Sequence, residues 1–219
     1  MGLLVGVVAA ALAARMRAQG TPVPYTRKTF HFVIFSAAAA VHGVWGLPGT
    51  NAYGSVVAAL VLVAVARGDG NPFYEALARE TDRPHRSLFI LVPLSTTAVG
   101  GLMSALLAGP FASVGYLVAG WGDAVGEPVG RRWGRHPYRV PSLAGVPAER
   151  TLEGSAAVFA VSWVAAALAL LGHGSPAEAV LVGLACAVAG TLFEAFSHHG
   201  LDNLTVQVGA SVTAIWLMG

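Results

Sequence analysis

The chain has 219 residues, of which 55% are hydrophobic and 11% are charged, and its formal net charge is +2. A soluble domain carries about 25% charged residues, so the composition excludes an ordinary soluble protein, and the small net charge gives no reason to expect a nucleic-acid partner. The mean hydropathy of +0.65 and the 27 glycines instead indicate helices that pack closely within a lipid bilayer.

Eight apolar runs predict membrane-spanning helices, because a span needs about 17–25 apolar residues and shorter runs can extend into their flanks. In chain order they cover residues 2–14, 30–45, 53–66, 87–108, 111–126, 155–171, 176–196 and 204–218. Unbroken apolar runs favour helices over the alternating pattern of a membrane barrel. We therefore expect an all-α integral membrane helical bundle of about 7–8 transmembrane helices, in a single polytopic domain over residues 1–219.

The basic residues predict how this bundle is oriented. With the N-terminus outside, the loops near 15–29, 67–86, 127–154 and 197–203 lie inside, and the first three contain all thirteen lysines and arginines. Because cytosolic loops carry the excess of Lys and Arg, these loops are predicted to face the cytosol. In a bacterium the protein would lie in the inner (plasma) membrane, with its active site facing the cytosol.

Most acidic residues lie on the same predicted side as the basic ones, although the rule for cytosolic loops concerns only Lys and Arg. Only Glu178 falls near the outer face, and several carboxylates cluster at the inner ends of spans. Charges at a membrane edge are costly and often functional, so the cluster suggests a metal and anion site. Interfacial salt bridges are the alternative. The clustered residues are Asp123, Glu127, Glu153, Glu194 and Asp202.

Residues 122–134 combine small and charged side chains at helical spacing. Four glycines recur every four residues and would form one stripe on a helix, beside two carboxylates that are also four apart. Two arginines follow a proline that kinks or ends the helix. Carboxylates hold Mg²⁺ with phosphate oxygens, and arginines bind phosphate bidentately, so the stretch suits a metal-bound polyphosphate. The glycine spacing taken alone favours a close-packed helix pair with a salt-bridged end. The residues are Gly122, Gly126, Gly130, Gly134, Asp123, Glu127, Pro128, Arg131 and Arg132.

The start of the next span is a second candidate anion site. Thr151 can cap this helix, and exposed N–H groups at a helix start favour a phosphate. An ordinary capped helix start is the alternative. The residues that would line the site are Arg150, Thr151, Gly154 and Ser155.

Two smaller clusters lie on the same predicted side. Arg27, Lys28 and His31 precede the second span, where they would face one site or simply anchor the span at the interface. Glu194 ends the seventh span, and Asp202 with Asn203 precedes the eighth, where Asp202 would bind a ligand or cap the helix.

In chain order the four motifs are residues 27–31, residues 122–134, residues 150–155, and Glu194 with Asp202 and Asn203. Together, from Arg27 to Val206, they resemble the motifs of the CTP-dependent lipid alcohol kinases: dolichol kinase, phytol kinase and CTP-using diacylglycerol kinase. These families fall within the wider phosphatidate cytidylyltransferase superfamily. Two positions depart from the pattern, since Arg150 stands where a lysine is common and Gln207 where a proline is common.

The resemblance implies CTP as co-substrate, Mg²⁺ as cofactor and transfer of the γ-phosphoryl group to a lipid alcohol, of polyprenol or phytol type, at the cytosolic interface. It implies catalytic roles for Asp123, Lys28, His31 and Glu194. It implies nucleotide binding by Arg27, Gly122, Gly126, Gly130, Arg131, Arg132, Arg150, Thr151, Gly154 and Ser155. Metal binding would fall to Asp123, Glu127, Glu153, Asp202 and Asn203, and which carboxylate acts as the base stays open.

Other functions stay open at this stage. A cytidylyltransferase would transfer CMP to a lipid phosphate, but the Gly200-Leu201-Asp202-Asn203 sequence differs from the ending of those enzymes and favours a kinase. A transporter would carry charges at the membrane midplane and an internal repeat, and a membrane scaffold would bind no nucleotide. The lipid bilayer is an expected partner, and the glycine-rich faces permit a homodimer.

Overall fold

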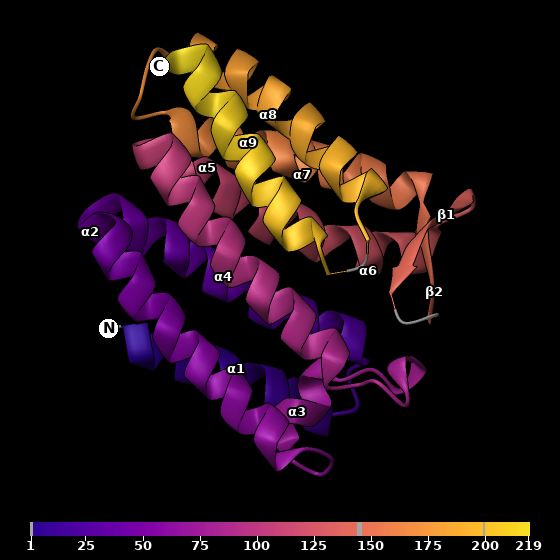
Figure 1. The fold of residues 1–219 in the computed structure, drawn as a ribbon. Helices are drawn as coiled ribbons and strands as arrows, with labels where there is room; N and C mark the ends of the chain where they lie inside the picture. The colour runs from indigo at the N-terminus through magenta and orange to yellow at the C-terminus, as the bar shows by residue number, and fades with distance from the viewer. Residues whose placement is uncertain (1, 144–145, 199) are drawn as a thin grey trace.

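The computed structural model describes residues 2–143, 146–198 and 200–219 (Figure 1). The predicted all-α class is confirmed, because helices make up most of these residues. The helices and helical turns are α1 (Gly2–Ala18), α2 (Val23–Arg67), α3 (Pro72–Leu77), η1 (Glu80–Asp82), α4 (Leu88–Ala108), η2 (Gly109–Phe111), α5 (Ala112–Leu117), η3 (Val118–Gly122), α6 (Asp123–Trp133), α7 (Leu152–Leu170), α8 (Pro176–Phe196) and α9 (Asp202–Met218).

Within the described ranges, four helical stretches are long and apolar enough to cross a membrane. Two of them, of 45 and 46 residues, each contain two of the predicted spans. α1 and α9 have 17 residues each, somewhat short of the roughly 20 that a span needs. The count of seven to eight spans therefore stays a prediction. The four stretches are Val23–Arg67, Leu88–Trp133, Leu152–Leu170 and Pro176–Phe196.

The longest helix, α2, is two arms joined by a bend. Gly46 has φ 59° and ψ −153°, a conformation that side chains disfavour and glycine permits, and Pro48 follows it inside the helix. The Tyr53 hydroxyl donates a hydrogen bond to the carbonyl of Ile34 at 3.2 Å, so the two arms lie side by side. The bend thus separates the two spans predicted at 30–45 and 53–66.

A two-stranded β-hairpin interrupts the predicted loop near 127–154, where the sequence analysis expected no strand. Strand β1 (Pro137–Leu143) pairs antiparallel with β2 (Val146–Thr151), with Pro137 opposite Thr151 and Tyr138 opposite Arg150. Thr151 ends the hairpin and also caps α7, because its hydroxyl accepts from the N–H of Gly154 at 3.0 Å. The hairpin thereby places Arg150 at a fixed point beside the bundle.

The glycine stripe of α6 packs against α7. A Cβ added at Gly126 would lie 2.8 Å from Val158 Cγ2, and one added at Gly130 would lie 2.7 Å from Thr151 Oγ1. A Cβ at Gly122 would collide with Ser162. These glycines let two helix backbones approach closely, which is the helix-pair alternative raised by the sequence.

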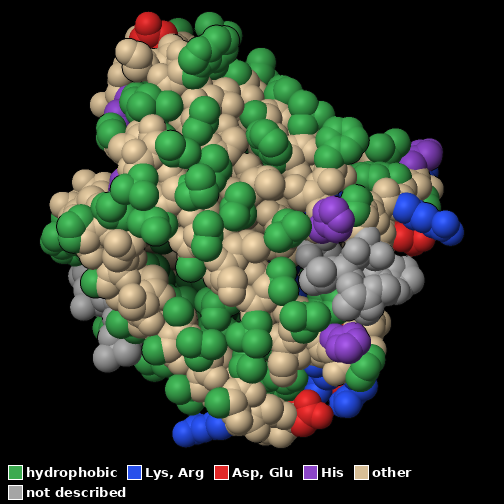
Figure 2. All heavy atoms as spheres, viewed as in Figure 1, with side chains coloured by type: hydrophobic (Ala, Val, Ile, Leu, Met, Phe, Trp, Pro, Cys, Tyr) green, Lys and Arg blue, Asp and Glu red, His purple; other side chains and the backbone are tan. Residues whose placement is uncertain are grey.

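The polar connections gather at one end of the bundle. The hairpin and α3 lie at the end away from both chain termini (Figure 1). Most of the Lys, Arg, Asp and Glu side chains visible from this side follow the same margin, while hydrophobic side chains cover the rest of the face (Figure 2). The fold therefore has one charged end and an apolar body.

Candidate functional site

Asp123 forms the first ion-paired group at the charged end. It begins α6 directly after the helical turn η3, and its Oδ2 lies 2.6 Å from Nζ of Lys28 in α2. His31 lies one turn further along α2, with Nε2 3.5 Å from the same oxygen and 3.2 Å from the carbonyl oxygen of Ala119. Lys28 and Asp123 are only 11% and 18% exposed, so water screens this pair weakly.

Arg150 forms the second group and joins three elements. Its Nε lies 2.9 Å from Glu194 Oε1 at the end of α8, and its Nη2 donates to Asp202 Oδ2 at 2.8 Å at the start of α9. Asn203 donates through its side chain to Thr97 of α4 at 2.9 Å. Residues from β2, α8, α9 and α4 thus meet at the charged end.

Two residues of the second group, and Arg27 next to Lys28 in α2, have buried polar atoms with no hydrogen-bond partner among the described residues. These are Oε2 of Glu194, Nη1 of Arg150 and Nη1 of Arg27. Buried polar atoms are nearly always bonded, and exceptions need an explanation. A bound ligand with both donor and acceptor character would supply the missing bonds.

Glu127 and Asp123 have different ion-pair partners. Nη2 of Arg79 and Nε of Arg131 both bind it, the second at 3.4 Å. The sequence analysis missed Arg79, because one arginine in a basic loop carries no pattern that distinguishes it. Two arginines already balance this carboxylate, so Glu127 shapes the margin of the site.

A cavity of about 980 Å³ connects these groups. Its polar end is lined by the charged residues of both groups and by Arg27, Arg79, Glu127 and Arg131. Its apolar arm continues between α2 and α4, along Ile34, Phe35, Ala38, Leu94 and Leu102. A head group and a hydrocarbon chain could therefore bind in one continuous space.

Most of the predicted site residues line this cavity. They are Arg27, Lys28, His31, Asp123, Gly126, Glu127, Gly130, Arg131, Arg150, Thr151, Gly154, Ser155, Glu194, Asp202 and Asn203. They come from distant parts of the chain, and the fold brings them around one space.

Three predicted residues do not line the cavity. Gly122 packs against α7, and the exposed guanidinium of Arg132 lies 5.3 Å from the centre of the Trp133 ring. Glu153 points to the hairpin, where it accepts from the backbone N–H groups of Arg135 and His136 and lies 2.6 Å from the His136 ring. Glu153 thus fastens the residues just before β1 to the start of α7.

The start of α7 offers fewer free N–H groups than the sequence analysis assumed. The N–H of Leu152 donates to the carbonyl of His136, and that of Gly154 donates to Thr151. A phosphate here would bind mainly to side chains, of which Arg150 and Ser155 line the cavity.

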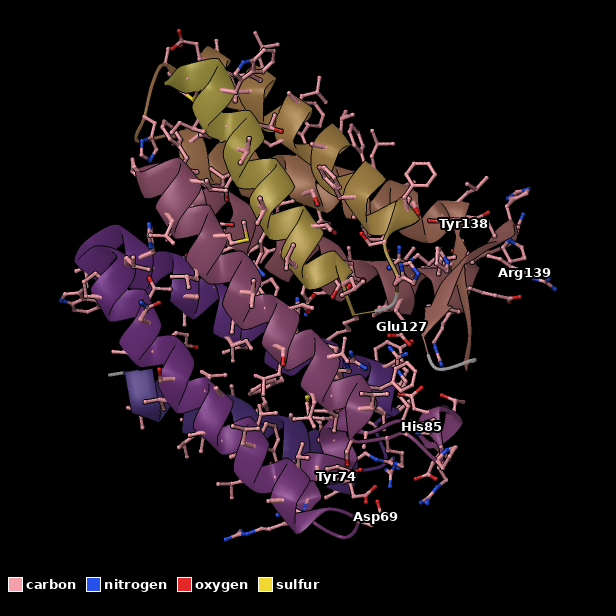
Figure 3. The ribbon with its side chains drawn as sticks, viewed as in Figure 1. Asp69, Tyr74, His85, Glu127, Tyr138 and Arg139 are labelled. Atoms are coloured by element: carbon pink, nitrogen blue, oxygen red, sulfur yellow. The ribbon has the colours of Figure 1, made fainter. Side chains whose placement is uncertain are left out.

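Tyr138 is a neighbour that the sequence analysis missed. It projects from β1, and its hydroxyl lies 2.7 Å from Ser155 Oγ. Figure 3 shows Tyr138 and Glu127 at the same end of the bundle as His85, Tyr74 and Asp69. Burial raises the pKa of the Tyr138 phenol, so the phenol stays protonated at neutral pH and can donate a hydrogen bond at the margin of the site.

Metal binding depends on which donor atoms the fold brings together. Within the described ranges no group of three or more His, Cys, Asp or Glu is arranged to hold one. Mg²⁺ usually binds through only one or two carboxylates together with substrate phosphates. The carboxylates of Asp123 and Asp202 at the cavity fit that smaller requirement.

Comparison with curated proteins finds that a phytol kinase from Synechocystis sp. is similar to this chain. The two are 32% identical over 206 residues, which cover 90% of this chain and 83% of that protein. No protein-family model matches the chain, and no solved structure matches it.

Proposed function

The chain belongs to the phytol kinase family, and on that premise we propose that it transfers the γ-phosphoryl group of CTP to a lipid alcohol of prenol or phytol type. The observation that carries the proposal is the shape of the cavity, which is charged at one end and apolar along its arm. A lipid alcohol has the same division, with a polar hydroxyl on a hydrocarbon chain.

The cations at the polar end suit a triphosphate. Catalysis of phosphoryl transfer consists mainly of positioning and charge stabilisation, and arginines bind phosphate oxygens bidentately. In this proposal Arg27, Arg131 and Arg150 hold the phosphates, while Lys28 and His31 lie next to the transferred group. The unbonded Nη1 atoms of Arg27 and Arg150 supply donors for this purpose.

Glu194 is our proposed base. One of its oxygens binds Arg150, while Oε2 has no partner among the described residues. It would accept the proton of the alcohol as the alcohol oxygen bonds to the γ-phosphorus. The bond from the γ-phosphorus to its bridging oxygen breaks, and CDP leaves. Glu194 and the alcohol would then meet where the polar end joins the apolar arm.

Asp123 and Asp202 are our proposed magnesium ligands. Mg²⁺, when bound, neutralises charge on the phosphate oxygens. Lys28 and Arg150 orient these two carboxylates toward the cavity. The charged end would face the cytosol, where CTP is available, because the loops at that end carry the basic residues.

Labelled CTP tests the proposal. The purified protein is mixed with Mg²⁺, phytol or another prenol, and CTP labelled at either the γ- or the α-phosphate. We expect the γ-label to appear in the lipid and the α-label to stay in CDP. Transfer of the α-label to a lipid phosphate would instead show cytidylyl transfer. If neither the γ-label nor the α-label appeared in any lipid tested, both enzyme proposals would be refuted.

A further inference from the structure

The apolar arm of the cavity follows single faces of two neighbouring helices. On α4 its lining residues recur every four positions, at Ile90, Leu94, Ala98 and Leu102. Helices rise 1.5 Å per residue, so this stretch is about 18 Å long. The hydrocarbon core of a bilayer is about 30 Å thick. The arm therefore extends from the charged end past the middle of the membrane.

The apolar arm of the cavity is open on one side. Gly54 and Ser55, in the half of α2 that follows the Gly46 bend, line the cavity and are exposed. Ala98 and Leu102 on α4 also line it and are exposed. Figure 1 shows α4 beside this second half of α2, and α2 and α4 contact each other. Exposed residues at this depth face lipid, so the opening connects the cavity to the interior of the bilayer.

Small residues border the opening. A Cβ added at Gly54 would meet nothing within 4 Å, and Ala58 lies one turn further along the same face of α2. Ala98 stands on the α4 side. Since small side chains leave a space between neighbouring helices, a hydrocarbon chain can pass between α2 and α4.

We propose that this opening, bordered by Gly54 and Ala58 of α2 and by Ala98 and Leu102 of α4, is the lateral entrance for the hydrocarbon chain of the acceptor. The inference rests on the proposed function, whose acceptor it specifies. The hydroxyl reaches Asp123 and Glu194, the chain lies along the arm, and its far end stays in the bilayer. One arm suits alcohols with one slender chain, and the open side sets no upper limit on chain length.

Two glycine variants of α2 test the entrance. In Gly54→Phe the ring would fill the opening, and the fold should tolerate it because the site is empty within 4 Å. Gly43→Phe is the matched control, since Gly43 lies on the same helix, has the same free space and does not line this cavity. Geraniol ends inside the arm, whereas phytol and a longer polyprenol extend beyond it.

We expect Gly54→Phe to lower the ratio of kcat/KM for phytol to that for geraniol by about tenfold or more. Gly43→Phe should leave this ratio unchanged, and the wild type should use phytol and the polyprenol about equally. An unchanged ratio in Gly54→Phe would overturn the entrance. So would efficient phosphorylation of diacylglycerol, whose second chain has no place in one arm.

Photocrosslinking separates failure of the entrance from failure of the proposed function. A long-chain alcohol carrying a diazirine at the part of its chain that would cross the opening is irradiated with the full-length protein in nanodiscs, with no nucleotide present. We expect crosslinked peptides from residues 51–58 and 98–102. Labels that appear only on the outer faces of α7 and α8 would refute the entrance, whether or not CTP is the donor.

Discussion

Two clusters of arginine and carboxylate lie at the same end of this bundle and differ in what surrounds them. The first, which we term the loop cluster, centres on Arg86, whose two terminal nitrogens bind Asp69, Glu75 and Glu80 at 2.6, 2.7 and 3.1 Å. The second, the cavity cluster, comprises Lys28, Asp123, Arg150, Glu194 and Asp202. The central residues of the loop cluster line no part of the large cavity, whereas every member of the cavity cluster lines it.

The difference separates a structural role from the binding role that we propose. Arg86 also donates to the carbonyl of Ala78 at 3.0 Å, so it ties the connection around α3 together. Nε of Arg86 has no hydrogen-bond partner among the described residues, but Arg86 does not line the cavity. Glu194 and Arg150 each keep such an atom and do line it. Charge composition alone does not distinguish the two clusters. They differ in whether the residues that have unpartnered polar atoms also line the cavity.

The largest expected effect comes from the same substitution made in each cluster. Asp123→Asn removes a proposed magnesium ligand and should lower kcat by about 10³-fold, the scale of losing a central electrostatic or acid–base group. Asp69→Asn, in the loop cluster, should leave kcat within about twofold. Activity is measured with γ-labelled CTP on protein that circular dichroism shows to be folded. Equal activities in the two variants would erase the proposed distinction.

Arg150→Gln should reduce both activity and stability. It leaves Glu194 and Asp202 buried without their cation, which costs about 3–5 kcal/mol for a buried pair, and removes a phosphate contact worth about 10²-fold in kcat. Thermal unfolding in detergent and the labelled-CTP assay measure the two effects. Arg150→Lys keeps the charge and should recover much of both. Full activity in Arg150→Gln would remove this residue from the proposed phosphate site.

Arg86→Gln should reduce stability alone. Its side chain is 5% exposed, but Asp69 and Glu80 are each 59% exposed, so water screens part of the interaction. We expect a loss of about 2 kcal/mol, seen in thermal unfolding, and unchanged activity per folded molecule. Arg83→Gln, at an exposed neighbour in the same cluster, serves as the control and should unfold like the wild type. A selective fall in kcat of Arg86→Gln would assign the loop cluster to the active site.

The smallest expected effect is a pH dependence in the loop cluster. The hydrogen bond from Arg86 lowers the pKa of Glu75 below its ordinary value of 4.5. The stability that the ionised Glu75 contributes is therefore fully present above pH 4.5, and it is lost as the pH falls through the lowered pKa. The difference in melting temperature between wild type and Glu75→Gln should shrink over that range. A difference that persists at lower pH would show that the interaction does not depend on ionisation.

Local patterns allowed some features to be predicted and left others hidden. The apolar runs gave the helical class, and the motifs named residues such as Asp123 and Arg150 that the fold brings to one cavity. The hairpin was missed, because its short strands occupy a polar loop without a clear alternation. Glu153 illustrates the limit of a motif, since its neighbours Gly154 and Ser155 line the cavity while its own carboxylate binds His136, just before the hairpin.

The sequence by itself determined that the chain is helical and apolar and that its basic residues cluster in a few connections, because hydropathy and charge are sums over neighbouring residues. Only the tertiary structure decided which arginine meets which carboxylate, that Arg79 binds Glu127, and that the glycines at 122, 126 and 130 pack against α7 and its cap. Ion pairing and packing depend on distances between elements that can be far apart in the sequence. Arg150 and Asp202, for example, lie 52 positions apart in the chain and 2.8 Å apart in the fold.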